Sequence, residues 1–257
     1  MLTFVGLGLY DEQSVTVAGR EAIRNADRVF AEFYTSRLVG TDLESLEAYH
    51  DTTIEVRDRA GVEQDPDPIL DAAETENVVF LTAGDTMVST THTDLRLRAA
   101  DRGIETHVIH GTTAQTAAAS LTGLQNYRFG KATTLPFEKA HGGDGVPDSV
   151  VRTIEDNQSR DLHTLVYLDI KVDDPHWDDG DDTYMTADHA ATLLAEEFPD
   201  TLAVVVARAG GPDTAVAADT LSALADRSFG SPLHLLVIPG SLHLIEEEAL
   251  TALADAP

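Results

Sequence analysis

The sequence contains no cysteine. This absence excludes disulfide bonds, thiolate metal ligands and cysteine nucleophiles together. Long apolar runs are also missing, since the longest, residues 202–207 and 233–238, are far too short to span a bilayer. The first residues show no basic segment followed by a cleavage-type site, so we expect no signal peptide. These absences favour a soluble cytoplasmic protein.

Basic residues are scarce. The 257 residues include 17 lysines and arginines against 45 aspartates and glutamates, which gives a formal net charge of −28. The acidic excess extends over both halves of the chain, and the lysines are limited to Lys131, Lys139 and Lys171. No basic stripe is present to replace the counterions of a nucleic acid. An acidic, lysine-poor surface suits molar salt, where screening shortens to about 3 Å, so we expect a halophilic source.

Strand-like and helix-like segments alternate along a chain that is long enough for two domains of ordinary size. In the first half, apolar runs predict strands at residues 2–8, 28–33, 77–83 and 104–111. Strands that alternate with helices and are apolar on both faces predict an α/β protein with mainly parallel sheets. We place the boundary near residues 110–114. The expected domains are an N-terminal α/β domain, residues 1–111, and a C-terminal α/β domain, residues 112–257.

The second half has longer and more polar loops. Its predicted strands are residues 163–172, 201–211 and 232–240. An alanine-rich segment, residues 213–228, is predicted to form one helix between the last two strands. The acidic segment at residues 173–182 lacks the ordered pattern of a calcium-binding EF-hand loop. We interpret it as a solvated loop and expect no metal site.

Glycines and small polar residues gather where the predicted strands of the first half end. Such ends are where open parallel sheets bind ligands, and glycine there permits close approach of the main chain. The glycines after the first strand do not form a dinucleotide fingerprint, because its third glycine would fall at Asp11. Phosphate-binding G-x-x-x-x-G-K-[ST] and nucleophile-elbow G-x-S-x-G patterns are also absent.

The segment LTAGDTMVSTTH, residues 81–92, is the most specific of these strand ends. In one interpretation it is only a turn, in which Gly84 adopts a positive φ and Asp85 bonds the main chain. Thr90 or Thr91 would then cap the following helix. In the other interpretation, the turn contacts a ligand, since it is longer than helix capping requires.

The histidines do not predict a metal centre. His107 and His110 are three residues apart on one predicted strand and therefore point to opposite faces. His234 lies inside an apolar run, which is typical of a buried histidine bonded to the main chain. His243 is predicted to be a surface or packing residue in the first turn of the last helix.

Five segments together resemble the diphthine synthases, methyltransferases of the tetrapyrrole-methylase-like class that use S-adenosylmethionine (SAM). The segments are FVGLGLYDEQSVTVAG, LTAGDTMVSTTH, LVYLDIK, VVVARAG and LHLLVIPGSLHLIEEEAL. The resemblance runs from residue 2 to about residue 250. It implies two α/β domains with the cofactor in the cleft between them, and a homodimer. It also implies a protein substrate, translation elongation factor 2. The amino group of its 3-amino-3-carboxypropyl-histidine would be methylated to the trimethylated diphthine of diphthamide biosynthesis.

The resemblance further implies a set of cofactor-binding positions but no catalytic residue. The set is Leu9, Asp85, Val88, Thr113, Ala114, Leu168, Ala209 and His234. It moves our interpretation of His234 from packing to cofactor contact and favours a binding role for Asp85. The base that deprotonates the amine stays open between solvent and a positioned carboxylate. Two alternative functions also remain, a precorrin-type tetrapyrrole C-methyltransferase of the same fold and a non-catalytic SAM-binding module.

Overall fold

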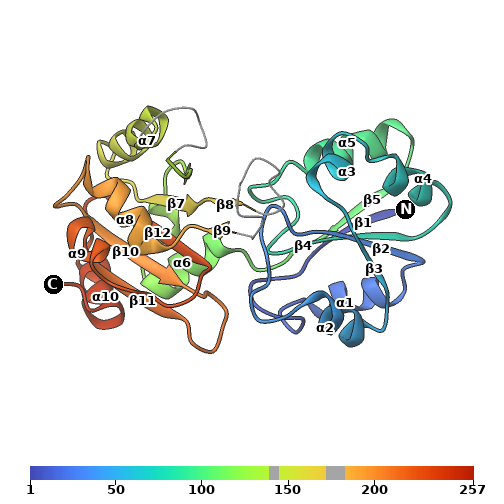
Figure 1. The fold of residues 1–257 in the computed structure, drawn as a ribbon, viewed down its shortest axis with the longest axis horizontal. Coiled ribbons are helices and arrows are strands. Elements are labelled where there is room, and N and C mark those ends of the chain that lie inside the picture. Colours follow the sequence, from blue (N-terminus) through green and yellow to red (C-terminus); the bar gives the residue numbers. More distant parts are fainter. Residues whose placement is uncertain (139–144, 172–182) are drawn as a thin grey trace. The chain divides into compact units, whose positions relative to one another are not determined.

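The computed structural model describes residues 1–138, 145–171 and 183–257. These residues form two compact units, one comprising Met1–Thr113 and Lys171, the other comprising Ala114–Ile170 and Thr183–Pro257. Each unit contains a five-stranded sheet with helices on both faces (Figure 1). The predicted α/β class is confirmed. The acidic segment at residues 173–182 lies outside the described residues.

The sheet of the N-terminal unit is entirely parallel, in the order β3-β2-β4-β1-β5. Its strands are β1 Leu2–Gly6, β2 Arg28–Glu32, β3 Ile54–Val56, β4 Val78–Thr82 and β5 Thr106–Ile109. The helices between them are α1 Val17–Arg24, α2 Leu43–His50, α3 Arg59–Glu63, α4 Asp67–Thr75 and α5 Thr93–Asp101. Parallel pairing requires such crossovers. The carboxyl ends of all five strands therefore lie along one edge of the sheet.

Two layers of apolar side chains hold these helices to the sheet. Phe4 and Phe80 point to one face and pack with residues of α3, α4 and α5. Val5 and Leu81 point to the other face and pack with residues of α1 and α2. This alternation follows from the period of two along a strand. Figure 1 shows the two groups of helices on opposite sides of the sheet.

The sheet of the C-terminal unit is mixed, in the order β11-β10-β12-β7-β6. Its strands are β6 Thr133–Leu135, β7 Thr164–Leu168, β10 Leu202–Ala207, β11 Ala215–Thr220 and β12 His234–Ile238. Strands β6 and β7 are parallel, whereas the three other neighbouring pairs are antiparallel. The prediction of mainly parallel sheets is therefore wrong for this unit. The short strands β8 Ile170–Lys171 and β9 Thr183–Tyr184 pair with each other.

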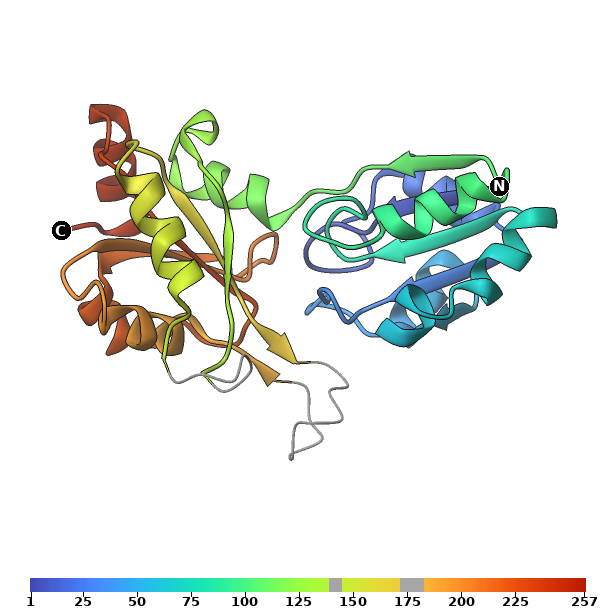
Figure 2. The same ribbon diagram turned by 90° about the horizontal axis from the view of Figure 1, so that it is seen from above.

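The helices of the C-terminal unit also cover both faces of their sheet. They are α6 Ala114–Thr122, α7 Asp148–Gln158, α8 Ala187–Ala195, α9 Leu221–Ala225 and α10 Leu244–Ala254, with a 3-10 turn η1 at Asn126–Arg128. Residues of α7, α8 and α9 pack on one face, and residues of α6 and α10 pack on the other. Figure 2 shows the chain passing from β5 directly into α6. Within the described ranges, no helix is both long and apolar enough to cross a membrane.

The prediction of one helix over residues 213–228 is wrong. Residues 215–220 form β11, and only Leu221–Ala225 are α-helical, as α9. Strand β11 pairs antiparallel with β10 from Ala215 opposite Ala207 to Thr220 opposite Leu202. Alanine-rich segments have a helical preference of only tenths of a kcal/mol per residue. The main-chain bonds of an adjacent strand outweigh that preference here.

Candidate functional site

Three glycines bring the main chains of β1, β4 and β5 together at the carboxyl edge of the N-terminal sheet. A Cβ atom at Gly6 would lie 2.5 Å from the carbonyl oxygen of Gly84 and 2.6 Å from the nitrogen of Gly111. A Cβ atom at Gly111 would overlap the same Gly84 oxygen. Gly8 and Gly84 also exchange main-chain hydrogen bonds, of 3.2 and 2.6 Å. Gly6 and Gly111 are therefore required by packing between main chains.

Gly84 has a different role from its two neighbours. Its φ of +75° lies in the left-handed region that favours glycine. A Cβ atom at this position would meet nothing within 4 Å, so there is open space beside the main chain. Of these glycines, Gly84 is the one that leaves room for a ligand at the strand ends.

Asp85 follows Gly84, and its buried carboxylate fastens two segments of this edge. One oxygen, Oδ1, accepts a 2.9 Å hydrogen bond from the main-chain N–H of Met87. The other, Oδ2, accepts a 3.2 Å bond from the N–H of Gly111 and lies 2.8 Å from Nδ1 of His110. These are the bonds from side chain to main chain that the turn interpretation predicts. They join the loop after β4 to the end of β5.

The threonines of the same loop do not cap α5. Thr90 donates its hydroxyl hydrogen to the carbonyl oxygen of Thr86 at 2.6 Å, and Thr91 donates to Glu63 at 2.9 Å. The N-cap residue is His92, which makes no side-chain cap hydrogen bond. The predicted cap is therefore wrong, because the two hydroxyl groups are engaged within the loop and with α3.

A buried acid and a buried histidine lie beneath this loop. Glu32 ends β2 and accepts hydrogen bonds from the N–H groups of Tyr34 and Thr35, both at 3.0 Å. Burial raises the pKa of Glu32, and the hydrogen bonds from Thr35 and Tyr34 oppose that rise. His92 places Nε2 3.4 Å from Glu32 Oε1, while its Nδ1 lies 3.0 Å from the carbonyl oxygen of Thr86. Burial lowers the pKa of His92 to about 4. The contact that ties His92 to the loop after β4 is therefore the one from Nδ1 to Thr86, whereas Nε2 makes no hydrogen bond.

The eight predicted cofactor-binding residues divide between the two units. Leu9, Asp85, Val88 and Thr113 belong to the N-terminal unit, at or just beyond the ends of β1, β4 and β5. In the C-terminal unit, Ala114 begins α6, and Leu168 ends β7. Ala209 follows β10, and His234 begins β12. Because Ala207 pairs with His234 and Tyr167 pairs with Leu235, the last three positions lie at one edge of their sheet.

His234 is buried, and both of its ring nitrogens have main-chain partners. Nδ1 accepts a 3.0 Å hydrogen bond from the N–H of Ala187, and Nε2 donates to the carbonyl oxygen of Ser231 at 2.9 Å. Burial lowers the pKa of the imidazole, which agrees with a neutral ring. This is the buried, main-chain-bonded histidine that the sequence pattern suggested. Its polar ring atoms are already engaged, so any ligand contact would use its main chain or its ring faces.

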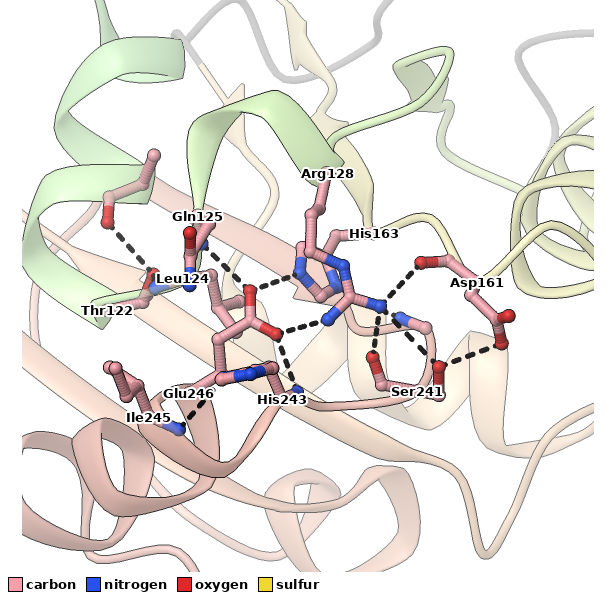
Figure 3. A network of polar contacts seen from close by, with 12 residues as sticks. Thr122, Leu124, Gln125, Arg128, Asp161, His163, Ser241, His243, Ile245 and Glu246 are labelled. Carbon is pink, nitrogen blue, oxygen red and sulfur yellow. Dashed lines mark hydrogen bonds and ion pairs between the residues drawn. The ribbon is translucent and has the colours of Figure 1, made fainter.

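The opposite edge of the same sheet carries a buried polar network, shown in Figure 3. Glu246 accepts hydrogen bonds from Arg128 at 2.5 Å, from the N–H of Gln125 at 2.9 Å and from the N–H of His243 at 2.9 Å. Its Oε1 lies 2.9 Å from Nε2 of His163, the residue before β7. Burial alone would raise the pKa of Glu246, but these hydrogen bonds lower it to about 2. We infer that this buried carboxylate holds the surrounding segments together and takes no part in a reaction.

The prediction that His243 lies on the surface is confirmed, since the residue is exposed, and its main-chain N–H also bonds to Glu246 of that network. It is the N-cap of α10, and its side chain accepts a 3.3 Å hydrogen bond from the N–H of Ile245. Glu246 bonds back to the N–H of His243, which completes a capping box. In the described part of the chain, no group of three or more histidine, aspartate or glutamate side chains could hold a metal ion.

Comparison with known proteins gives a consistent result over the whole length. The family model described as Tetrapyrrole (Corrin/Porphyrin) Methylases matches residues 1–225. A protein of Haloarcula marismortui named diphthine synthase is 79% identical, covering 100% of this chain and 99% of that protein. One of Natronomonas pharaonis with the same name is 71% identical, covering 100% and 97%. These relatives support the halophilic source expected from the acidic composition.

Solved structures agree with the sequence relatives. A crystal structure of a diphthine synthase superposes with a TM-score of 0.88 at 38% identity, covering 100% of this chain and 96% of that one. The structure of a putative diphthine synthase from Entamoeba histolytica gives a TM-score of 0.87 at 34% identity, covering 100% and 99%.

Proposed function

Since the chain belongs to the tetrapyrrole methylase family and, within it, to the diphthine synthases, we propose that its acceptor is translation elongation factor 2. The chain is a methyltransferase. The proposed reaction is successive transfer of methyl groups from SAM to the amino group of a 3-amino-3-carboxypropyl-histidine, which gives the trimethylated diphthine. The observation that carries this proposal is the 79% identity to a diphthine synthase over the full chain.

The residues at the strand ends suit a cofactor such as SAM. Gly84 leaves open space beside its main chain, and Asp85 holds the loop around it in place. We propose that SAM is bound by Leu9, Asp85, Val88, Thr113, Ala114, Leu168, Ala209 and His234. The bound cofactor would supply an electrophilic methyl group on its sulfonium. The protein would then orient the acceptor amine, and such positioning can lower a barrier by several kcal/mol.

We further propose a homodimer that acts in the cytoplasm. The dimer is implied by the resemblance to the diphthine synthases, and the location follows from the proposed substrate, because translation factors work on ribosomes. Light scattering in multimolar KCl would test the dimer.

Replacing Asp85 with alanine is expected to weaken SAM binding by about tenfold or more. The substitution leaves the N–H groups of Met87 and Gly111 without their acceptor. The loop after β4 would then no longer be held against Gly111, so SAM would have to order this edge on binding. A cost of about 1.4 kcal/mol for that ordering corresponds to a factor of ten in affinity. Calorimetry in multimolar KCl measures the affinity. The matched control is Asp94→Ala, which removes an exposed carboxylate from α5. An unchanged SAM affinity for Asp85→Ala would refute a role for Asp85 in cofactor binding.

The substrate is tested by mass spectrometry. Elongation factor 2 carrying the unmethylated 3-amino-3-carboxypropyl group is incubated with the protein and SAM in multimolar KCl. A mass gain of three methyl groups on the modified histidine peptide is the expected result. SAM binding without any mass gain would contradict the proposal and favour a tetrapyrrole acceptor or a non-catalytic module. Binding of a porphyrin-like macrocycle would then favour the tetrapyrrole acceptor over the non-catalytic module.

A further inference from the structure

An exposed histidine lies beside the buried Asp85 at the edge proposed to bind the cofactor. The side chain of His110, which follows β5, is 77% exposed, whereas that of Asp85 is 3% exposed. Nδ1 of His110 lies 2.8 Å from Oδ2 of Asp85. The carboxylate is itself fixed by the N–H groups of Met87 and Gly111. One ring nitrogen of His110 is therefore held by a rigid partner while the ring extends into solvent.

This contact determines which nitrogen of His110 carries the proton. Both oxygens of Asp85 accept hydrogen bonds from main-chain N–H groups, as a carboxylate does. Nδ1 must therefore donate its hydrogen to Asp85. In the neutral ring, Nε2 then has a free lone pair. A carboxylate that holds an imidazole in this tautomer, with its second nitrogen directed outward, is the arrangement by which enzymes orient a histidine base.

We propose that His110 is the general base of the methyl transfer and that Asp85 is its positioning residue. This role rests on the proposed function, in which the acceptor is an amine. An ammonium group has no lone pair and cannot attack a methyl group. Each transfer to nitrogen therefore requires that one proton leave first.

Each proposed transfer begins with the loss of one proton from the acceptor. Nε2 of His110 takes a proton from the acceptor ammonium, which leaves a neutral amine and an imidazolium stabilised by Asp85. The amine nitrogen forms a bond to the methyl carbon, and the bond between carbon and sulfur breaks with its electron pair passing to sulfur. The imidazolium returns its proton to solvent before the next transfer. Three transfers to a primary amine release three protons, and the trimethylammonium product has none left to lose.

The buried titratable side chains at the two strand-end edges do not fit this role. Glu32 and His92 are enclosed beneath the loop after β4. Both ring nitrogens of His234 are engaged by the main chain. Glu246 lies at the opposite edge of the C-terminal sheet. His110 combines exposure, a fixed tautomer and a place at the strand ends.

The test compares His110→Ala with His107→Ala, which removes an exposed histidine from β5, the strand that His110 follows. Removing a general base lowers kcat by about 100-fold or more. We expect that loss for His110→Ala, with SAM affinity by calorimetry unchanged and with partial rescue by added imidazole. His107→Ala should retain wild-type kcat. Asp85→Asn should also lose kcat, because its amide can hold the ring in the opposite tautomer.

A second readout needs neither cofactor nor turnover. Nitrogen-15 NMR of the free wild-type protein should show His110 protonated at Nδ1 and unprotonated at Nε2, and Asp85→Asn should disturb this pattern. A neutral ring protonated at Nε2 would overturn the proposal. Wild-type kcat in His110→Ala, or a loss that imidazole does not rescue, would also overturn it while leaving the proposed function intact. A wild-type protein that methylates no elongation factor 2 would overturn the proposed function itself.

Discussion

Replacing Glu246 with alanine is expected to lower the free energy of unfolding by about 3–5 kcal/mol, the usual cost of removing one partner from a buried ion pair. The side chain is fully buried and accepts hydrogen bonds from Arg128 and from the N–H groups of Gln125 and His243. Without it, the Arg128 guanidinium and His163 lose their shared anion. The turn before η1, the start of β7 and the start of α10 would no longer be held together.

The same network has a defined pH dependence. The pKa of Glu246 is about 2 in the folded protein and 4.5 as its ordinary value. A carboxylate whose pKa is lowered by folding stabilises the fold above its unfolded pKa. That contribution decreases as the pH falls from about 4.5 towards 2. Glu246→Ala should therefore be less sensitive to acid over this interval than the wild type.

Denaturant unfolding in multimolar KCl at neutral and acidic pH measures both effects. The matched control is Glu247→Ala, the exposed neighbour on the same helix, which should unfold like the wild type. Equal stabilities of Glu246→Ala and Glu247→Ala would show that the network contributes nothing to folding.

Replacing Gly111 with alanine is expected to disrupt the edge at which β1, β4 and β5 meet. The added Cβ atom would overlap the Gly84 carbonyl oxygen and lie 2.8 Å from the carbonyl carbon of Gly6. Both neighbours are main-chain atoms, so relief requires the strands to separate. We expect a loss of about 3 kcal/mol, the upper part of the usual range for overpacking. SAM binding should also be lost, because the N–H of Gly111 would move away from Asp85.

Thermal unfolding and calorimetry of Gly111→Ala, compared with Gly103→Ala, check this prediction. A Cβ atom at Gly103 meets nothing within 4 Å, although its φ is +72°. That control should therefore lose only the cost of left-handed backbone, about 1–2 kcal/mol, and should keep SAM affinity. Wild-type SAM affinity in Gly111→Ala would contradict the close packing of the three strand ends.

The parallel N-terminal sheet could be predicted because its strands are marked by short apolar runs. Residues 2–6 and 78–82 are buried on both faces, as expected for strands between two layers of helices. The hairpin of β10 and β11 could not be predicted in the same way. Its alanines suit a helix or a strand, and the neighbouring strand decided between them. Pairing between strands is a property of the fold that a local pattern does not contain.

The candidate site was predictable in position but not in contacts. The sequence placed Gly84, Asp85, His110 and Gly111 at strand ends, where the structure brings them together. The bond between Asp85 and His110 joins residues 25 positions apart, so spacing along the sequence does not reveal it. From the sequence, His110 was considered only as a metal ligand together with His107, and that pair was rejected. Glu32 was missed as well. An acidic residue inside an apolar strand was the available signal.

The exposed ion pairs of this acidic chain contribute less to its stability than the buried contacts of Glu246. Arg102 contacts Asp67 and Asp71 on the surface, and such pairs contribute about 0–1 kcal/mol even in dilute buffer. In molar salt the screening length is about 3 Å, so they contribute less still. Glu246, by contrast, is fully buried, and its bonds to Arg128 and His163 are less screened than those surface pairs. We therefore expect surface charges to be freely exchanged as related sequences diverge, whereas the residues around this enclosed carboxylate are replaced only together.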